Sequence, residues 1–387
     1  MRPDMMKDAL FVSQTAEKGG AELFMLDIIA HGPEGWNGCF FTEGPAEREL
    51  ASLGRQPIVL SGGAGLSGIR REASALKLIG AAGGVISLAR ALARAASGYR
   101  VICANSQKAL FVSALASLIM RRPLVWVLHD IITDPAFSAN TRRAAVLFAN
   151  LFASRVVANS KASAEAFIAA GGKGDRVRVV YCGFDPAAHP QGSPEASATL
   201  RQRFGLSDAP VLGLFGRLTP WKGQHVLLQA LKDLPGVQAL IVGSALFGED
   251  AYAAELRTLA ETEGLAERVH FAGFQNDVAA IMAGVDLVLH TSTHPEPFGR
   301  VVVEGMLAGR PVIATSGGGV NEIVTDGDTG LLVPPSDPAA LAVAVRRVLA
   351  DPALASRLAE SGRASAAQRF HIAQTCRDMA NALKETG

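Results

Sequence analysis

The chain has 387 residues and a formal net charge of +1, and 49% of its residues are hydrophobic. This length suits two domains rather than one. We expect no nucleic-acid partner. The overall balance conceals an asymmetry, because residues 1–190 carry 21 Lys and Arg against 15 Asp and Glu, whereas residues 191–387 carry 16 against 21. The basic first half indicates an acidic or membrane-bound partner, although a solvated surface bias is the simpler explanation.

Cysteine usage and the first residues of the chain indicate the compartment. Residues 1–8 include two acids and lead directly into a strand, so they do not match a signal peptide. The apolar run over residues 110–120 is too short to span a bilayer. We therefore expect a cytoplasmic protein, either soluble or peripheral on the inner face of the membrane. The cysteines are scattered, which favours a reducing environment and argues against a zinc site: Cys39, Cys103, Cys182 and Cys376.

Strands and helices alternate along the first half of the chain, which is typical of a doubly wound parallel sheet. Helical periodicity covers residues 21–30 and an Ala-rich segment over 73–97 that we expect to break at Gly83-Gly84. A Pro, Gly and Ser cluster over residues 186–194 is typical of a linker. The predicted strands cover residues 9–13, 38–41, 57–60, 99–104, 124–128, 155–158 and 177–181.

The second half repeats this alternation, and Ala-rich helices follow from residue 337 onward. We therefore predict two α/β domains, over residues 1–188 and 189–369. The expected strands of the second domain lie near Val211, Ala239, Arg268, Asp286 and Pro311.

A cationic motif lies at the first strand of the second domain. The apolar strand from Val211 ends in Gly216-Arg217, and a short turn delivers Lys222 at the start of a helix over residues 224–234. Free N–H groups at a helix N-terminus attract anions, and an added guanidinium and ammonium suit a diphosphate. A strand–helix corner with two surface cations is the alternative.

Two further motifs follow downstream. Glu296 and Glu304 stand eight positions apart around a Pro-Phe-Gly turn, so that the first lies in a loop and the second on the helix that the turn opens. Both carboxylates can then face one cleft, although a capped surface helix explains the pair equally well. The glycine run 317–319 precedes a short helix and permits close backbone approach to phosphate oxygens, unless it is a flexible turn.

The order of these motifs resembles the family-four retaining glycosyltransferases, whose fold is the two-domain GT-B architecture. The resemblance implies two Rossmann-like domains that face each other across a cleft, the first for the acceptor and the second for a nucleotide sugar, with residues 370–387 returning to the first. It rests on Gly216-Arg217, Lys222-Gly223, the two glutamates, the glycine run before Glu322, and residues 326–334. It is looser over residues 18–22, at His129-Asp130 and over 181–185, where Cys182 replaces the usual Asn.

The resemblance implies retaining transfer by a front-face route, in which the leaving phosphate accepts the acceptor's proton and His129 positions the donor sugar. Arg217 and Lys222 would stabilise the diphosphate without a metal or other cofactor. Glu304 would bind the ribose diol, and Glu296 would bind sugar hydroxyls. The other expected donor contacts are Gly19, Gly20, Gly216, Gly273, Phe274, Phe298, Gly299, Arg300, Gly318 and Gly319, with the base held by a loop over 269–274.

The acceptor side is less clearly encoded. We expect a glycan, lipid-linked or other cell-envelope acceptor, with Asn105, Ser106 and Asp130 on the acceptor side. The helix predicted over residues 142–155 has the composition of a helix that lies on a lipid surface, although such helices more often pack on a sheet. Basic residues flank the apolar helices of this half: Arg121, Arg122, Arg142 and Arg143.

Three patterns point to other chemistry and are set aside. Residues 63–68 spell a dinucleotide fingerprint, but no acid occurs between Glu72 and Asp130 to bind a ribose, so we expect a mobile loop at the cleft rim. Asp326-Gly327-Asp328 has the composition of a turn rather than a metal site. His290 and His294 lack the shared helix that would place both on one metal ion.

Two alternatives remain open besides a hexosyltransferase. A nucleotide-sugar 2-epimerase shares the two-domain fold but needs no acceptor. A non-catalytic nucleotide-sugar-binding subunit would be expected to have lost Arg217, Lys222 or Glu296, and all three are present. The residues leave the base, the sugar and the acceptor undetermined, with UDP-sugars and GDP-mannose as the leading donors.

Overall fold

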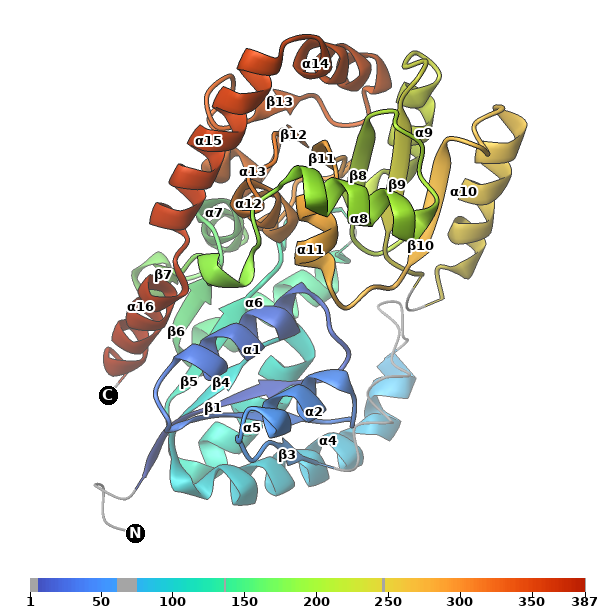
Figure 1. Ribbon diagram of the computed structural model, residues 1–387. Helices are drawn as coiled ribbons and strands as arrows, with labels where there is room; N and C mark the ends of the chain where they lie inside the picture. Colours follow the sequence, from blue (N-terminus) through green and yellow to red (C-terminus); the bar gives the residue numbers. More distant parts are fainter. Residues whose placement is uncertain (1–5, 61–74, 136, 246–247, 387) are drawn as a thin grey trace. The chain divides into compact units, whose positions relative to one another are not determined.

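The computed structural model describes residues 6–60, 75–135, 137–245 and 248–386 (Figure 1). The chain divides into two compact units, Met1–Gly183 with Ile372–Gly387, and Phe184–His371. The division falls at Phe184 rather than at residue 189, because the Phe184 N–H donates to the Phe370 carbonyl at 2.8 Å and the residue pairs with His371. Each unit is an α/β unit built on a parallel sheet, as predicted.

The first unit contains a seven-stranded sheet in the order β3-β2-β1-β4-β5-β6-β7. Its central strands are continuous apolar runs because helices cover both faces of a parallel sheet. The strand order reverses between β1 and β4, and ligands of such sheets bind at that reversal. The strands are β1 (Lys7–Ser13), β2 (Trp36–Phe40), β3 (Ile58–Val59), β4 (Tyr99–Ala104), β5 (Leu124–Leu128), β6 (Ala153–Ala158) and β7 (Val177–Val179).

The helices of the first unit differ from the sequence predictions at two places. Helix α4 (Ala75–Ala95) continues through Gly83 and Gly84, because two glycines only weaken a helix whose neighbours are good helix formers. Helix α6 (Ala139–Phe152) ends before Arg155, which pairs with Val125 in the sheet. The other helices are α1 (Gly20–His31), α2 (Pro45–Ser52), α5 (Gln107–Met120), α7 (Lys161–Ala169) and α16 (Ile372–Lys384).

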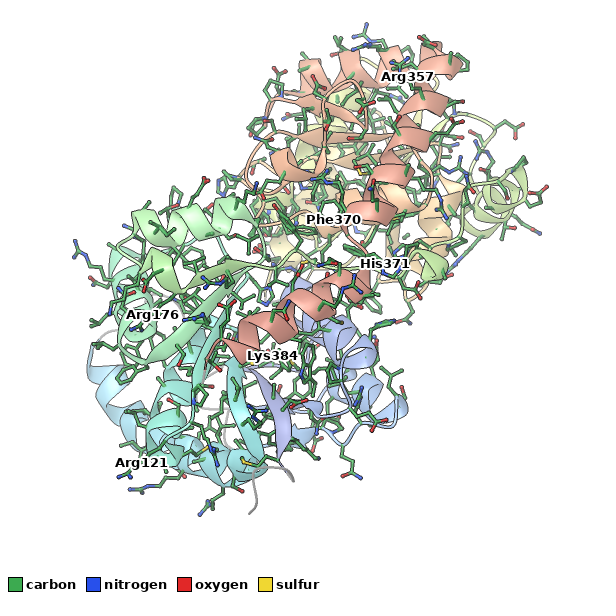
Figure 2. All side chains as sticks on the ribbon, turned by 90° about the vertical axis from the view of Figure 1, so that its left-hand side faces the viewer. Arg121, Arg176, Arg357, Phe370, His371 and Lys384 are labelled. Atoms are coloured by element: carbon green, nitrogen blue, oxygen red, sulfur yellow. The ribbon has the colours of Figure 1, made fainter. Side chains whose placement is uncertain are left out.

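Helix α16, which ends at the Lys384 labelled in Figure 2, belongs to the first unit. It packs on α1, where the Cys376 Sγ lies 3.8 Å from the Ile28 carbonyl oxygen. Its buried side includes Ile372, Met379 and Leu383. Among the described residues, no helix combines the length and the apolar character needed to cross a bilayer.

The second unit contains a six-stranded parallel sheet in the order β10-β9-β8-β11-β12-β13, which reverses between β8 and β11. The strands are β8 (Val211–Phe215), β9 (Gln238–Val242), β10 (Val269–Gly273), β11 (Leu287–His290), β12 (Val312–Thr315) and β13 (Leu331–Val333). The helices are α8 (Pro194–Phe204), α9 (Gln224–Leu231), α10 (Asp250–Thr262), α11 (Val278–Gly284), α12 (Arg300–Leu307), α13 (Val320–Ile323), α14 (Pro338–Ala350) and α15 (Pro352–Arg369).

Candidate active site

The predicted cation and carboxylate of the second unit meet where its strand order reverses. Lys222 ends a 3-10 turn after β8, and Glu296 lies in the loop after β11. These strands are neighbours and parallel, so both loops leave the same edge of the sheet. The Lys222 ammonium donates to the Glu296 carboxylate, at 2.9 Å to Oε1 and 2.8 Å to Oε2. The sequence did not predict that these two side chains bind each other.

Glu296 is a buried carboxylate with two further partners. The Ser292 hydroxyl donates to its Oε2 at 2.8 Å, and the His290 Nε2 lies 3.2 Å from the same oxygen. Burial raises the pKa of Glu296, but the charge of Lys222 and the hydrogen bond from His290 outweigh this effect and hold the pKa well below its usual range. Glu296 is therefore an ionised hydrogen-bond acceptor.

His290 and Ser292 are site residues that the sequence interpretation missed. His290 was considered only as a metal ligand with His294, yet it is buried at the end of β11, whereas His294 is exposed. Its position six residues before Glu296 at a strand end is the signal that could have found it. Among the described residues, no cluster of three His, Cys, Asp or Glu could hold a metal ion.

The backbone at the same sheet edge is built from glycine. Gly216, Gly243 and Gly273 follow or end the neighbouring strands β8, β9 and β10, and all three have positive φ. A Cβ on Gly243, where φ is +142°, would lie 2.0 Å from the Gly216 carbonyl oxygen. Gly243 was not predicted as a site residue, although it is needed for this close approach of two loops.

Arg217 is half-buried in the loop between β8 and α9. The fully buried Gln224 side chain donates from Nε2 to the Arg217 carbonyl at 2.7 Å. The Thr219 hydroxyl of the same loop donates to Glu249 at 3.1 Å. These bonds hold the loop that carries Arg217 and Lys222.

The second glutamate lies on α12, as the helical pattern predicted. Gly299 precedes this helix with φ +109°, and Phe298 is buried against Phe370 with a ring-centroid distance of 5.6 Å. The Arg300 guanidinium lies 3.4 Å from the Glu304 Oε1. Arg300 and Glu304, both expected donor contacts, thus form an ion pair.

The glycine run is not an open phosphate cradle throughout. The Gly319 N–H already donates to the Glu296 carbonyl at 2.8 Å, and the expected donor contact of this residue stays a prediction. Gly318 pairs with Glu296, and a Cβ on Gly318 would lie 2.1 Å from that residue's carbonyl oxygen. The run is rich in glycine because it packs tightly against the loop that carries Glu296.

The segment expected to hold the base is mostly a strand rather than a loop. Residues Val269–Gly273 form β10, because they pair with β9 at the edge of the sheet. Only Gly273 and Phe274 remain at the strand end, and the Phe274 side chain is 61% exposed.

In the first unit, three predicted segments come together at the reversal of the strand order. The buried Asn105, which follows β4, donates from Nδ2 to the Ala21 carbonyl in the first turn of α1 at 2.9 Å. Its Oδ1 lies 2.9 Å from the Nε2 of His129, which follows β5. Asn105 therefore links His129 to the start of α1, where Gly19 and Gly20 lie.

The other two predicted acceptor-side residues differ in their environment. The Ser106 hydroxyl accepts the Ala109 N–H at 3.2 Å and caps α5, so its side chain has a structural role. Its O–H is still a possible donor, so its assignment as an acceptor contact stays a prediction. Asp130 is half-buried next to His129.

One of the patterns that were set aside is accounted for by the structure. Asp326-Gly327-Asp328 forms a turn, in which Gly327 has φ +76° and the Asp326 Oδ1 accepts the Leu332 N–H at 2.9 Å. This confirms the turn prediction. The expected loop over residues 63–68 lies outside the described residues.

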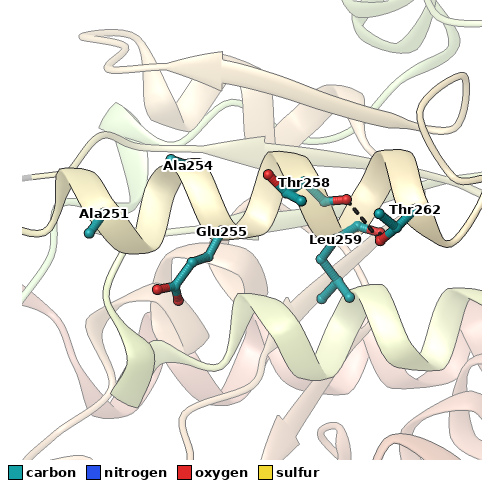
Figure 3. A pocket seen from close by; sticks show the side chains of 6 residues that line it. All are labelled: Ala251, Ala254, Glu255, Thr258, Leu259 and Thr262. Carbon is teal, nitrogen blue, oxygen red and sulfur yellow. Dashed lines mark hydrogen bonds between the residues drawn. The ribbon is translucent and has the colours of Figure 1, made fainter.

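A surface groove on α10 does not coincide with this site. Figure 3 shows that its lining comes from one side of a single helix, and no predicted site residue contributes to it. Its polar groups are few, and the Thr262 hydroxyl already donates to the Thr258 carbonyl at 2.9 Å. The lining residues are Ala251, Ala254, Glu255, Thr258, Leu259 and Thr262.

Comparisons with known proteins assign the family. Residues 197–365 match the family described as Glycosyl transferases group 1, and residues 47–188 match Glycosyltransferase Family 4. The chain is 37% identical over 164 residues to the lipopolysaccharide core biosynthesis glycosyltransferase LpsE of Rhizobium meliloti, covering 42% of this chain and 46% of that protein. It is 35% identical over 230 residues to D-inositol 3-phosphate glycosyltransferase of Acidothermus cellulolyticus, covering 57% and 50%. These matches span about half the length of the curated relatives.

A solved structure matches over nearly the whole chain. Anabaena Alr3699/HepE, in complex with UDP and glucose, is 40% identical with a TM-score of 0.89, and the match covers 98% of this chain and 99% of that one. The same Anabaena protein has also been solved with UDP-glucose. The chain belongs to the family-four glycosyltransferases of the GT-B fold.

Proposed function

We propose that this protein is a retaining hexosyltransferase that uses a nucleotide diphosphate sugar and no metal, with a glycan, lipid-linked or other cell-envelope acceptor. The observation that carries the proposal is the pair formed by the half-buried Lys222 and the buried Glu296 at the strand reversal of the second sheet. A cation for a diphosphate and a carboxylate for sugar hydroxyls are thereby held within one hydrogen bond of each other.

We assign UDP-hexose as the donor in preference to GDP-mannose. The assignment is supported by the Anabaena relative, which was solved with UDP-glucose and is 40% identical over 97% of this chain. The glycine ends of β8, β9 and β10 provide backbone close to the diphosphate and base, and Glu304 binds the ribose diol.

The reaction breaks the anomeric C–O bond while negative charge develops on the β-phosphate. Lys222 and Arg217 stabilise this charge, because cationic donors aimed at a growing charge lower the barrier most in a site shielded from water. Lys222 is suited to this role since its side chain is only 18% exposed. It must exchange Glu296 oxygens for phosphate oxygens when the donor binds.

Glu296 accepts hydrogen bonds from the sugar hydroxyls, and its lowered pKa keeps it ionised for that purpose. In the first unit, His129 positions the sugar, with Asn105 fixing its ring through the 2.9 Å contact at Nε2. In the front-face route, the leaving phosphate accepts the proton of the attacking acceptor hydroxyl, so no side chain acts as base.

We further propose that the first unit touches an anionic membrane surface. Leu147 and Leu151 on α6 are 55% and 62% exposed, and Leu118 and Ile119 at the end of α5 are each 56% exposed. The two helices pack together through Phe111 and Phe148, with a ring-centroid distance of 4.9 Å. Exposed apolar side chains beside basic residues are the composition of an interfacial surface. Arg121, Arg122, Arg142 and Arg143 supply the charge, and Figure 2 labels Arg121.

A thermal-shift panel tests the proposed donor. UDP-glucose and related UDP-hexoses should raise the melting temperature, because a ligand that binds only the folded state stabilises it by mass action. GDP-, ADP- and dTDP-sugars at the same concentration are the matched controls. No shift with any nucleotide sugar would overturn the proposed function, whereas conversion of the donor sugar without an acceptor would favour an epimerase.

A further inference from the structure

His290 occupies a pocket that provides an acceptor for each of its ring nitrogens. Its Nε2 faces the Glu296 Oε2 at 3.2 Å, and its Nδ1 faces the Thr315 Oγ1 at 3.3 Å. The Thr315 hydroxyl donates its proton to the Ser292 carbonyl at 2.8 Å, so its oxygen can accept a hydrogen bond from Nδ1. A neutral imidazole needs only one such acceptor, whereas an imidazolium ring needs two.

Donor binding creates a demand for a second positive charge beside Glu296. If Lys222 serves the diphosphate, as the proposed function requires, the carboxylate loses the ammonium that now lies 2.8–2.9 Å from its oxygens. The Glu296 side chain is only 11% exposed, and the sugar hydroxyls that take the place of the ammonium supply hydrogen bonds but no positive charge. A buried carboxylate left without its partner is strongly unfavourable.

The groups around His290 are few. Glu296 faces it from the loop before α12, with Lys222 beyond that carboxylate, and the Ser292 and Thr315 hydroxyls complete the contacts. Arg217 follows β8, the neighbour of β11 on the side opposite to β12. Among these side-chain types, imidazole is the one that commonly exchanges a proton with solvent at physiological pH.

We propose that His290 is a positioning residue that takes up a proton from solvent when the donor binds, and so replaces Lys222 as the cation that holds Glu296. Its imidazolium then donates to Glu296 and to Thr315, which keeps the carboxylate aimed at the donor sugar. This inference rests on the proposed role of Lys222. Its consequence is that donor binding is linked to pH through a residue that touches no substrate.

The test is calorimetry of UDP-glucose binding at pH 8 in two buffers of different ionisation enthalpy. The wild-type protein should take up about one proton per donor, and its donor affinity should fall by about tenfold per pH unit as the imidazole loses its proton. His290→Gln keeps an N–H toward Glu296 but cannot be protonated, so its proton uptake and its pH slope should both vanish. Its kcat should fall more than its KM rises, because Glu296 is displaced at the sugar.

Two further variants keep the test informative if His290→Gln folds poorly. Thr315→Val removes the second acceptor, together with the hydroxyl's bond to the Ser292 carbonyl, and should also reduce proton uptake. His225→Gln, whose ring contacts Tyr252 at 2.9 Å, should leave it unchanged. Equal binding heats in both buffers for the wild-type protein would overturn the inference while leaving the donor assignment intact. No binding of UDP-glucose in either buffer would instead overturn the proposed function.

Discussion

Replacing Glu296 by Gln should strengthen the binding of free UDP while it slows sugar transfer. Lys222 donates to both carboxylate oxygens, at 2.9 and 2.8 Å, and the two side chains are only 18% and 11% exposed. The ammonium must give up these bonds to reach a diphosphate. Glutamine retains the shape and one acceptor oxygen but removes the negative charge, so Lys222 becomes available at a lower free-energy cost.

The magnitude follows from the bonds that Lys222 exchanges. One of the two bonds from the ammonium is lost outright in this variant, and a hydrogen bond of a charged group contributes about 1.5–3 kcal/mol. The lower end of that range, about 1.5 kcal/mol, corresponds to about tenfold tighter UDP binding. Turnover should nevertheless fall by about a hundredfold, because the sugar hydroxyls lose a charged acceptor in a site shielded from water.

Titration calorimetry with UDP on the wild-type protein, Glu296→Gln and Glu304→Gln measures the effect. Glu304→Gln is the matched control, since its carboxylate pairs with Arg300 rather than Lys222 and is assigned to the ribose. It should weaken UDP binding and raise the donor KM. If Glu296→Gln binds UDP more weakly than the wild-type protein, Lys222 does not serve the diphosphate. The reverse pattern in the two variants would exchange the roles of the two glutamates.

Four other outcomes are expected. Lys222→Ala should lower turnover by roughly a hundredfold, with Arg217→Ala similar, because each removes a cation from the growing phosphate charge; steady-state kinetics that show only a raised KM would contradict this role. Gly243→Ala should lower the free energy of unfolding, measured in urea, by at least about 2 kcal/mol, because its Cβ would lie 2.0 Å from the Gly216 carbonyl oxygen. Gly236→Ala should lower it less, because nothing lies within 4 Å of the added Cβ. Equal losses in the two variants would refute the packing argument. Transfer should persist in excess chelator, and activity restored only by Mg²⁺ or Mn²⁺ would show that a metal is required. Flotation with anionic vesicles should weaken as salt rises. Leu147→Gln should reduce it, whereas Val343→Gln, at a similarly exposed position on α14, should not. No flotation of the wild-type protein at low salt would contradict the membrane proposal.

The alternation of apolar strands and amphipathic helices was sufficient to predict two parallel α/β units. Strand boundaries such as Tyr99–Ala104 and Leu124–Leu128 could be predicted to the residue, because both are short, mostly apolar runs that a Gly or Pro precedes and a polar residue follows. The continuity of α4 through Gly83 and Gly84 could not be predicted, since it depends on the neighbouring helix-forming residues rather than on the two glycines alone. The end of α6 was likewise fixed by the pairing of β6 with β5.

The sequence by itself determined which residue types lie at the carboxyl edge of the second sheet, because motif order and strand ends are local properties of the chain. Only the tertiary structure decided how they pair. Lys222 and Glu296 are 74 positions apart, yet the neighbouring strands β8 and β11 bring their loops together. The same arrangement of strands places the buried His290 beside the Glu296 carboxylate, and the Gly319 N–H donates to the Glu296 carbonyl. Such contacts depend on strand order and register, which bring together side chains whose separation in the sequence gives no sign of their contact.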